Sequence, residues 1–201
     1  MPTLCPSCGE GLETPLACGA CGVLVQIDED PGPFEVLGLA PSIAVDTDDA
    51  RKRLRRFTRL VHPDFFALAG EDQVALAEAA GARLNAAHDL VVDFSARADW
   101  LVRHLGGPSE KELGAMPQAF LMEVMEWNEV LEENAPGSPC LAALAGELEE
   151  HRSGLVRSIT AALTPLPSPG DDSLGAVRKD LNALRYVDRA LARAAGEAPS
   201  L

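Results

Sequence analysis

The sequence predicts an all-α protein, in which two helical domains follow a small metal-binding segment. Two observations predict this fold class. Apolar residues recur at intervals of three and four along most of the chain, and no run of β-branched residues shows the alternation of a half-buried strand. The 201 residues, 47% hydrophobic and 24% charged, suit two small domains better than one large single-domain enzyme.

Two short segments rich in glycine and proline, here called breakers, divide the chain. Asp30-Pro31-Gly32-Pro33 ends a segment rich in cysteine and glycine, and Gly106-Gly107-Pro108 separates two helical regions. The predicted domains are 1–30, 31–107 and 115–201. A proline-rich stretch at 164–170 interrupts the last of them and is expected to be a surface loop, because proline lacks the amide donor that a helix needs.

Apolar stripes at helical spacing predict the core faces. The second domain has three: Leu54, Phe57, Leu60 and Val61; Leu76, Ala80, Leu84 and Ala87; Trp100, Leu101 and Leu105. The third domain has three longer ones: Phe120, Val124, Trp127 and Leu131; Leu141, Leu144, Leu148, Leu155 and Ile159; Leu174, Val177, Leu181, Leu184 and Leu191. The third domain is therefore predicted to be a three-helix bundle.

The charge balance limits the partners. Seventeen Lys and Arg against 31 Asp and Glu give a formal net charge of −14, which disfavours general nucleic-acid binding. No apolar run approaches the roughly 20 residues of a membrane-spanning helix. The first 30 residues hold no Lys or Arg, so neither a signal peptide nor a transit peptide is indicated. We expect a cytoplasmic protein that does not bind membranes.

Four of the five cysteines form two C-x-x-C pairs, Cys5 with Cys8 and Cys18 with Cys21, each followed at once by glycine. Such a turn directs two thiolates at one centre, and two turns supply the four ligands of tetrahedral zinc. We therefore predict one structural zinc ion, with no open position for catalysis. Because so short a segment cannot bury a core, the metal should supply most of its folding free energy.

Other interpretations of the cysteines exist. Iron in a rubredoxin-like site uses the same four ligands and stays open. The cytoplasmic address disfavours two disulfides, and the lack of a neighbouring strand–helix unit disfavours a redox C-x-x-C pair. Cys140, which follows Pro139, is expected to be an ordinary small helix residue.

Positive charge concentrates in residues 51–59, which hold six Lys and Arg and no acidic residue. Arg51, Arg55 and Arg59 are four residues apart and share one face of a helix expected at 48–61. We call these three the basic ridge. Like charges at this spacing mildly destabilise a helix, which favours an acidic binding partner. The alternative is a solvated face neutralised by the chain's own carboxylates.

His62-Pro63-Asp64 follows this helix directly, and the proline places His62 and Asp64 on a turn just past the basic ridge. The tripeptide is flanked by Phe-Glu-Val-Leu-Gly-Leu at 34–39, Leu-Asn-Ala-Ala-His at 84–88 and Ser-Ala-Arg-Ala-Asp-Trp-Leu at 95–101. This combination resembles the J domain, a helical hairpin module of co-chaperones that acts on DnaK-class ATPase chaperones.

Segments beyond the second breaker narrow the resemblance. Ala-Phe-Leu-Met-Glu-Val-Met-Glu-Trp at 119–127 is similar to the start of the C-terminal domain of the HscB family, the J proteins of iron–sulfur cluster assembly. Leu-Arg-Tyr-Val-Asp-Arg-Ala-Leu at 184–191 is similar to the last helix of that family. The likeness covers about 33–194. The cysteine segment resembles the extension of animal mitochondrial members, which shorter bacterial members lack.

The resemblance implies a co-chaperone and no enzyme activity. It implies that the protein stimulates the ATPase of a DnaK-class, HscA-like chaperone and delivers the IscU-type scaffold protein to it for iron–sulfur cluster assembly. It assigns the chaperone contact to His62, Pro63, Asp64, Arg51, Arg55 and Arg59. It assigns the scaffold contact to Leu121, Met122, Met125, Glu126 and Glu129.

Helical spacing supports the scaffold contact independently. The stripe that begins at Phe120 already supplies an inward face, so Leu121, Met122 and Met125 form a second apolar row that a simple bundle helix does not need. Methionine suits an adaptable contact surface, and the flanking glutamates make a polar rim. The alternative is a helix buried on two sides.

Two other functions stay open: a general J protein with another client, and a zinc-containing nucleic-acid-binding module. The acidity of the cysteine segment and its lack of aromatic residues disfavour the module. A hydrolase with His62 as general base and Asp64 as its orienting group lacks a nucleophile and a second acid. A homodimer is neither predicted nor excluded.

The remaining histidines carry no predicted function. His88 and His104 are expected to be surface or hydrogen-bonded helix residues. His151 lies between acidic and basic neighbours in the sequence and is expected on a solvated face.

Overall fold

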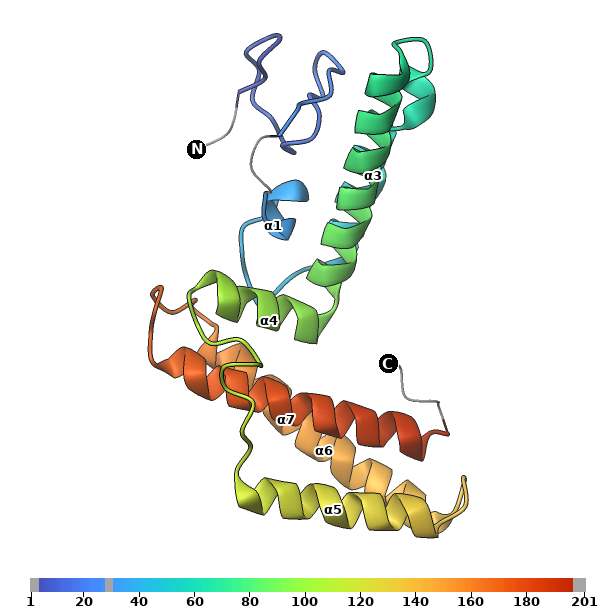
Figure 1. Ribbon diagram of the computed structural model, residues 1–201, viewed down its shortest axis with the longest axis vertical. Helices are drawn as coiled ribbons and strands as arrows, with labels where there is room; N and C mark the ends of the chain where they lie inside the picture. Colours follow the sequence, from blue (N-terminus) through green and yellow to red (C-terminus); the bar gives the residue numbers. More distant parts are fainter. Residues whose placement is uncertain (1–3, 28–30, 197–201) are drawn as a thin grey trace. The chain divides into compact units, whose positions relative to one another are not determined.

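The computed structural model describes residues 4–27 and 31–196 (Figure 1). The described residues form helices and no regular strand, which confirms the all-α prediction; isolated β-bridges occur only in the cysteine segment. The elements are α1 (Pro33–Val36), α2 (Thr47–Leu60), the 3-10 helix η1 (Pro63–Phe66), α3 (Glu71–Val92), α4 (Phe94–His104), α5 (Gln118–Glu133), α6 (Pro139–Ala162) and α7 (Ser173–Ala194).

Packing divides the chain into two compact units within α4, one extending to Arg97 and the other starting at Ala98. The Gly106-Gly107-Pro108 breaker, at which the sequence places the domain joint, therefore lies inside the second unit. Among the described residues, no helix is long and apolar enough to cross a bilayer.

The hairpin of α2 and α3 organises the first unit. Asp46 begins α2, because its carboxylate accepts hydrogen bonds from the backbone amides of Asp48 (2.9 Å) and Asp49 (3.1 Å). The two helices run antiparallel, α2 behind α3 in Figure 1. Phe57 of α2 is fully buried, and small side chains on α3 allow close packing of the pair. The buried residues of α3 are Ala77, Ala80, Leu84, Ala87 and Val91.

Arg97 ties the end of this hairpin together. Its side chain is buried, and its guanidinium donates to the backbone carbonyls of Ile43 (3.0 Å, from Nε) and Val91. Ile43 precedes α2 and Val91 lies in the last turn of α3, so one side chain joins the start of α2 to the end of α3 at the open end of the hairpin. This contact gives a structural reason for an arginine in the 95–101 motif.

The cysteine segment packs into the same unit. Thr14, Leu16 and Ala17 are buried, and the Thr14 hydroxyl donates to the carbonyl of Val36 in α1 (2.9 Å). Gly38 has a φ of +64°, and a Cβ there would lie 2.3 Å from the carbonyl oxygen of Glu13. The close approach therefore requires glycine at this position. The segment is thus part of the core of the first unit.

Helices α5, α6 and α7 form the predicted three-helix bundle of the second unit. Leu144 and Leu148 of α6 pack with Val187 and Ala190 of α7, and Trp127 of α5 packs against this cluster. No residue of α5 is fully buried, whereas α6 and α7 each carry a buried stripe. Helix α5 therefore lies on the outside of the bundle with one face exposed.

A buried arginine holds the segment before α5 on the bundle. Arg178 of α7 is completely buried, its Nε donates to the carbonyl of Pro108 (2.9 Å), and its Nη1 lies 2.7 Å from the Asp99 carboxylate. One turn later, the Asn182 amide donates to the carbonyl of Leu113 (2.8 Å). The sequence did not predict these contacts, since arginine is rarely buried.

Candidate functional sites

The four cysteines of the two C-x-x-C pairs converge as predicted. Their sulfur atoms all lie within 4.8 Å of one another, with Cys5 Sγ 3.6 Å from Cys21 Sγ and Cys8 Sγ 3.7 Å from Cys18 Sγ. Four thiolates around a tetrahedral ion at about 2.3 Å have sulfur–sulfur distances of about 3.8 Å. The cluster therefore has the size that a bound zinc or iron ion requires.

The two turns that carry the cysteines repeat one backbone design. The Gly9 amide donates to the Cys5 carbonyl and the Gly22 amide to the Cys18 carbonyl, each at 2.9 Å. Both glycines have a φ of +75°, which only glycine adopts readily. Each C-x-x-C-Gly turn is thus shaped by its glycine, and all four cysteines are free of disulfides.

The clustering shifts the acidity of the thiols. Burial raises the pKa of Cys5, but hydrogen bonds from the backbone of Cys8 and from neighbouring thiols outweigh it and lower the pKa to about 7. The backbone of Glu10 lowers the pKa of Cys8, but the neighbouring thiols and burial raise it to about 12. Four thiolates at these distances repel one another, so their joint ionisation needs a cation between them. The donor set therefore fits a thiophilic metal.

The six cations of residues 51–59 divide into three groups. Arg53 is structural, since it pairs with Asp49 (2.7 Å) and donates to the Gly38 carbonyl (2.7 Å). Arg51 pairs with Asp48 in its own helix (2.8 Å), and Arg56 pairs with Glu13 of the cysteine segment (3.0 Å). The remaining side chains, for which no partner is found among the described residues, are Lys52, Arg55 and Arg59. Two of the three residues of the basic ridge are therefore free to meet an external acid.

His62 and Asp64 lie together on the turn that begins η1. The Nδ1 atom of His62 accepts from the Asp64 amide (3.3 Å) and lies 3.5 Å from the Asp64 carboxylate. The carboxylate is 88% exposed, so it is available to a partner. The side chain of Phe65 next to it is 73% exposed and that of Leu68 is fully exposed, so two large apolar side chains are accessible beside the turn.

The predicted apolar face of α5 is exposed. Leu121, Met122 and Met125 are 41%, 57% and 64% exposed, and Glu126 and Glu129 beside them are exposed as well. The opposite face of α5 packs inward. This arrangement rules out, for the described chain, the alternative of a helix buried on two sides. We call Leu121, Met122 and Met125 the apolar face.

His151 does not lie on a solvated face as predicted. Its ring is half-buried and lies 6.1 Å from Phe120 and 5.7 Å from Trp127, measured between ring centroids. Tyr186 of α7 completes this aromatic cluster at 5.8 Å from Phe120. Neighbours in sequence suggested exposure, but the packing of α5 across α6 decides the environment of this ring.

The other two histidines differ from each other. His104 is exposed and stacks on Trp100 with 4.4 Å between ring centroids. His88 contacts Asp89 through Nδ1 (3.3 Å), whereas its Nε2 is buried and has no hydrogen-bond partner among the described residues. His88 is therefore a half-buried helix residue that uses one of its two ring nitrogens in a contact.

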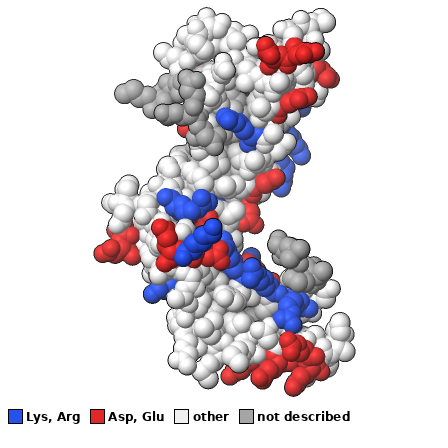
Figure 2. Space-filling model, in the orientation of Figure 1, with Lys and Arg blue, Asp and Glu red and all other residues white. Residues whose placement is uncertain are grey.

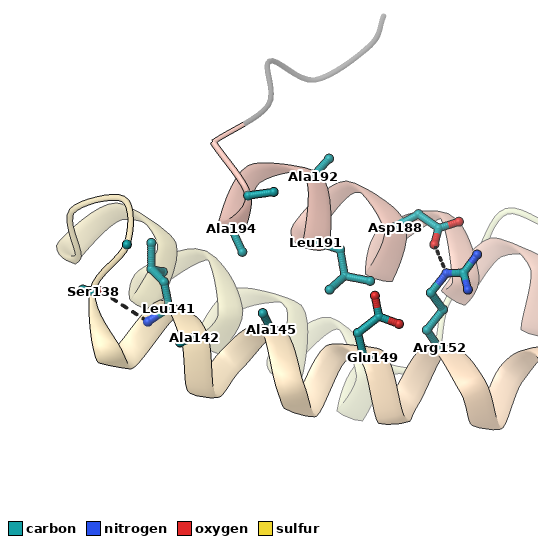
Figure 3. A pocket seen from close by; sticks show the side chains of 12 residues that line it. Ser138, Leu141, Ala142, Ala145, Glu149, Arg152, Asp188, Leu191, Ala192 and Ala194 are labelled. Carbon is teal, nitrogen blue, oxygen red and sulfur yellow. Dashed lines mark hydrogen bonds and ion pairs between the residues drawn. The ribbon is translucent and has the colours of Figure 1, made fainter.

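An open apolar groove of about 600 Å³ lies between α6 and the C-terminal end of α7 (Figure 3). Leu141, Ala145 and Leu191 form much of its wall, and an ion pair between Arg152 and Asp188 (2.8 Å) lies at one end. The groove brings together no nucleophile with a general base, so it offers no evident catalytic chemistry.

Comparison with known sequences identifies relatives of this chain. A family model described as the HSCB C-terminal oligomerisation domain matches residues 116–194. A co-chaperone protein HscB homolog from Bordetella avium is 34% identical over 127 residues, which are 63% of this chain and 76% of the relative. One from Shewanella amazonensis is 32% identical over 158 residues, 77% of this chain and 89% of the relative.

Solved structures show the same fold. The crystal structure of human co-chaperone protein HscB aligns with a TM-score of 0.75 at 24% identity, covering 92% of this chain and 93% of that one. Chaperone HscB from Vibrio cholerae aligns with a TM-score of 0.69 at 22% identity, covering 82% and 95%. From the sequence relatives, the chain belongs to the HscB co-chaperone family.

Proposed function

We propose that this chain stimulates the ATPase of a DnaK-class, HscA-like chaperone and delivers an IscU-type scaffold protein to it for iron–sulfur cluster assembly in the cytoplasm. One observation carries the proposal: two exposed surfaces of different chemistry lie on the two compact units, a charged turn on the first and the apolar face of α5 on the second. Both are exposed surfaces rather than enclosed pockets, which suits protein partners better than small substrates.

The chaperone contact is proposed to use Asp64, His62 and Pro63 on the turn and the basic ridge beside it. The exposed carboxylate of Asp64 can accept charge-assisted hydrogen bonds, which are among the stronger interactions across an interface. Arg55 and Arg59, with no acid of their own, attract an acidic surface over a distance. Arg51 contributes after it exchanges its exposed pairing with Asp48 for the partner.

The scaffold contact is proposed to centre on the apolar face, with Glu126 and Glu129 at its rim. Burying three large apolar side chains that are now 41–64% exposed supplies the driving force for association. The glutamates then favour a partner with basic residues around an apolar patch.

The metal is proposed to be one structural zinc ion held by Cys5, Cys8, Cys18 and Cys21. All four positions of a tetrahedral ion are filled by protein thiolates, so the ion would hold the fold and leave no position open for chemistry. Because Thr14, Leu16 and Ala17 are buried in the first unit, the ion would also help to stabilise the helical hairpin.

Reversing two unpaired charges tests the chaperone contact. The Arg55→Glu, Arg59→Glu double variant should lower the rate of association with the chaperone about tenfold or more near 0.1 M salt, where the Debye length is about 10 Å. The difference from wild type should shrink as the salt is raised. The readout is ATPase stimulation as a function of protein concentration at several salt concentrations.

The matched control is the Arg157→Glu, Lys179→Glu double variant, which makes the same charge change at two exposed residues of the other unit. It should leave stimulation unchanged. An equal loss in the control and the ridge variant, or a loss that persists at high salt, would argue against an electrostatic role of the basic ridge.

Removing one thiol tests the metal site. Cys8→Ser should abolish binding of one zinc equivalent and lower the melting temperature of the first unit, because the buried part of the cysteine segment loses its support. Cys140→Ser is the control, since Cys140 is exposed on α6 and outside the cluster. Metal analysis and thermal unfolding report the two effects. A full zinc equivalent in Cys8→Ser would contradict the four-thiolate site, and iron in the purified protein would reassign the ion.

A further inference from the structure

The outer face of α7 carries a second row of arginines. Arg185, Arg189 and Arg193 are four residues apart and therefore lie along one side of the helix. Figure 2 shows Lys and Arg side chains gathered over the C-terminal half of α7, and Asp and Glu side chains over the C-terminal half of α5. The second unit thus presents opposite charges on two neighbouring helices.

Among the described residues, acidic side chains pair only with the start of this row. Arg185 pairs with Glu110 and lies 4.0 Å from the Asp99 carboxylate. The Arg193 guanidinium donates to the neutral side-chain oxygen of Asn128 on α5. Arg189 is exposed and has no hydrogen-bond or ion-pair partner among the described residues. Two positive charges near the end of α7 therefore have no acidic partner in the part of the chain that the structure describes.

These two arginines line a groove between α5 and α7 with a volume of about 180 Å³. Trp127 and Asn128 form the α5 side of the groove, and Tyr186 lies with Arg189 and Arg193 on the α7 side. Two aromatic rings beside two guanidinium groups suit a side chain that bears a carboxylate. Its methylene groups can pack on the rings while its oxygens accept hydrogen bonds from the arginines.

The groove is continuous with the apolar face. Asn128 follows Met125 by three residues and Leu121 by seven, so all three lie in one row along α5. A protein that covers Leu121 and Met125 therefore also approaches the groove. Glu126 lies beyond Met122 on the far side of the apolar face, and Glu129 lies between Met122 and Met125 around the helix. The exposed Glu132 follows Asn128 by one turn in the same row. Arg189 and Arg193 face this row from the α7 side of the groove.

We propose that the scaffold contact extends across this groove onto α7, where Arg189 and Arg193 bind an acidic segment of the scaffold protein. This inference rests on the scaffold-delivery function proposed above. In a chain of net charge −14, an acidic segment is repelled by most of the surface, so the uncompensated end of α7 fixes which way the scaffold sits on α5.

The test is Arg189→Glu, because this exposed side chain makes no hydrogen bond or ion pair with any described residue that the substitution would remove. Calorimetric titration with the scaffold should give a dissociation constant about tenfold larger than for wild type at about 0.05 M salt. The dependence of affinity on salt should also be weaker in the variant. Arg157→Glu, with the same charge change on α6, should match wild type in both respects.

A second variant separates this inference from the proposed function. Suppose that wild type binds the scaffold and that Met122→Asp weakens this binding. If Arg189→Glu then behaves like Arg157→Glu, the extension onto α7 is wrong, while the scaffold contact at the apolar face is retained. If wild type does not bind the scaffold, the proposed scaffold delivery and the extension onto α7 are both wrong. If Arg189→Glu instead converts a dimer to a monomer in sedimentation and leaves scaffold affinity unchanged, the acidic face of a second copy occupies the groove, and the proposal is overturned.

Discussion

Replacing Asp64 with asparagine is expected to reduce stimulation of the chaperone ATPase to the basal rate while leaving the fold intact. The side chain is 88% exposed, and the only side chain that contacts it among the described residues is His62, at 3.5 Å. A surface change of this kind usually alters stability by less than about 0.5 kcal/mol. Losing one partner of a charged hydrogen bond across an interface costs about 2–5 kcal/mol, or roughly 30-fold or more in affinity.

The first unit supplies a matched control for this change. Asp89 on α3 is also exposed and also contacts a histidine, with 3.3 Å between its carboxylate and His88 Nδ1. Asp89→Asn removes the same charge from the same kind of pair, away from the turn at η1. It should stimulate like wild type. Normal stimulation by Asp64→Asn would remove the basis for a J-domain contact at this turn.

Placing a charge on the apolar face is expected to have the second large effect. Met122→Asp should weaken scaffold binding roughly 30-fold or more, because the lost burial of a methionine costs about 2 kcal/mol and a carboxylate must also be desolvated. ATPase stimulation by the variant alone should not change, because the proposed chaperone contact lies on the other compact unit. Titration calorimetry with the scaffold and a chaperone assay without it measure the two quantities separately.

Ala143→Asp serves as the control for this variant. Ala143 is exposed on α6, away from its buried stripe, so the substitution adds the same charge to the same domain without touching the apolar face. An equal loss of affinity in both variants would indicate a general charge effect. Unchanged affinity in Met122→Asp would assign the scaffold to a different surface.

Local pattern was enough to predict the helices and the metal cluster. The apolar stripe that includes Leu54 and Phe57 predicted a helix at 48–61, and α2 runs from Thr47 to Leu60. The four cysteines were predicted to converge because each C-x-x-C-Gly turn determines its own geometry from a few consecutive residues. The exposed row on α5 was also predictable, since a bundle helix needs only one inward face.

Contacts between distant residues were not predictable in the same way. The sequence shows six cations in residues 51–59, but only the packed structure shows that Arg56 meets Glu13 and that Arg53 holds the Gly38 carbonyl. His151 was misplaced because its environment is made by aromatic rings of α5. Arg178 was missed for a similar reason, since its partners Pro108 and Asp99 lie about 70 residues away or more.

The boundary between the two compact units also depends on contacts between residues that are distant in the sequence. Glycine and proline at 106–108 mark the end of a helix, and this local signal predicts a domain joint there. Helix α4 crosses the division instead, because Arg97 bonds into the hairpin while Asp99 pairs with Arg178 of the bundle. Two residues apart in sequence, these side chains belong to different cores.

Steady-state ATP hydrolysis by the DnaK-class chaperone, with this protein and the scaffold added singly and together, tests the central claim most directly. We expect stimulation by the protein alone and a larger rate with both present. Asp64→Asn should lose all stimulation, and Met122→Asp should lose only the increase that the scaffold adds. A rate that does not respond to the scaffold would contradict delivery, and a rate that does not respond to the protein at all would contradict co-chaperone action on this ATPase.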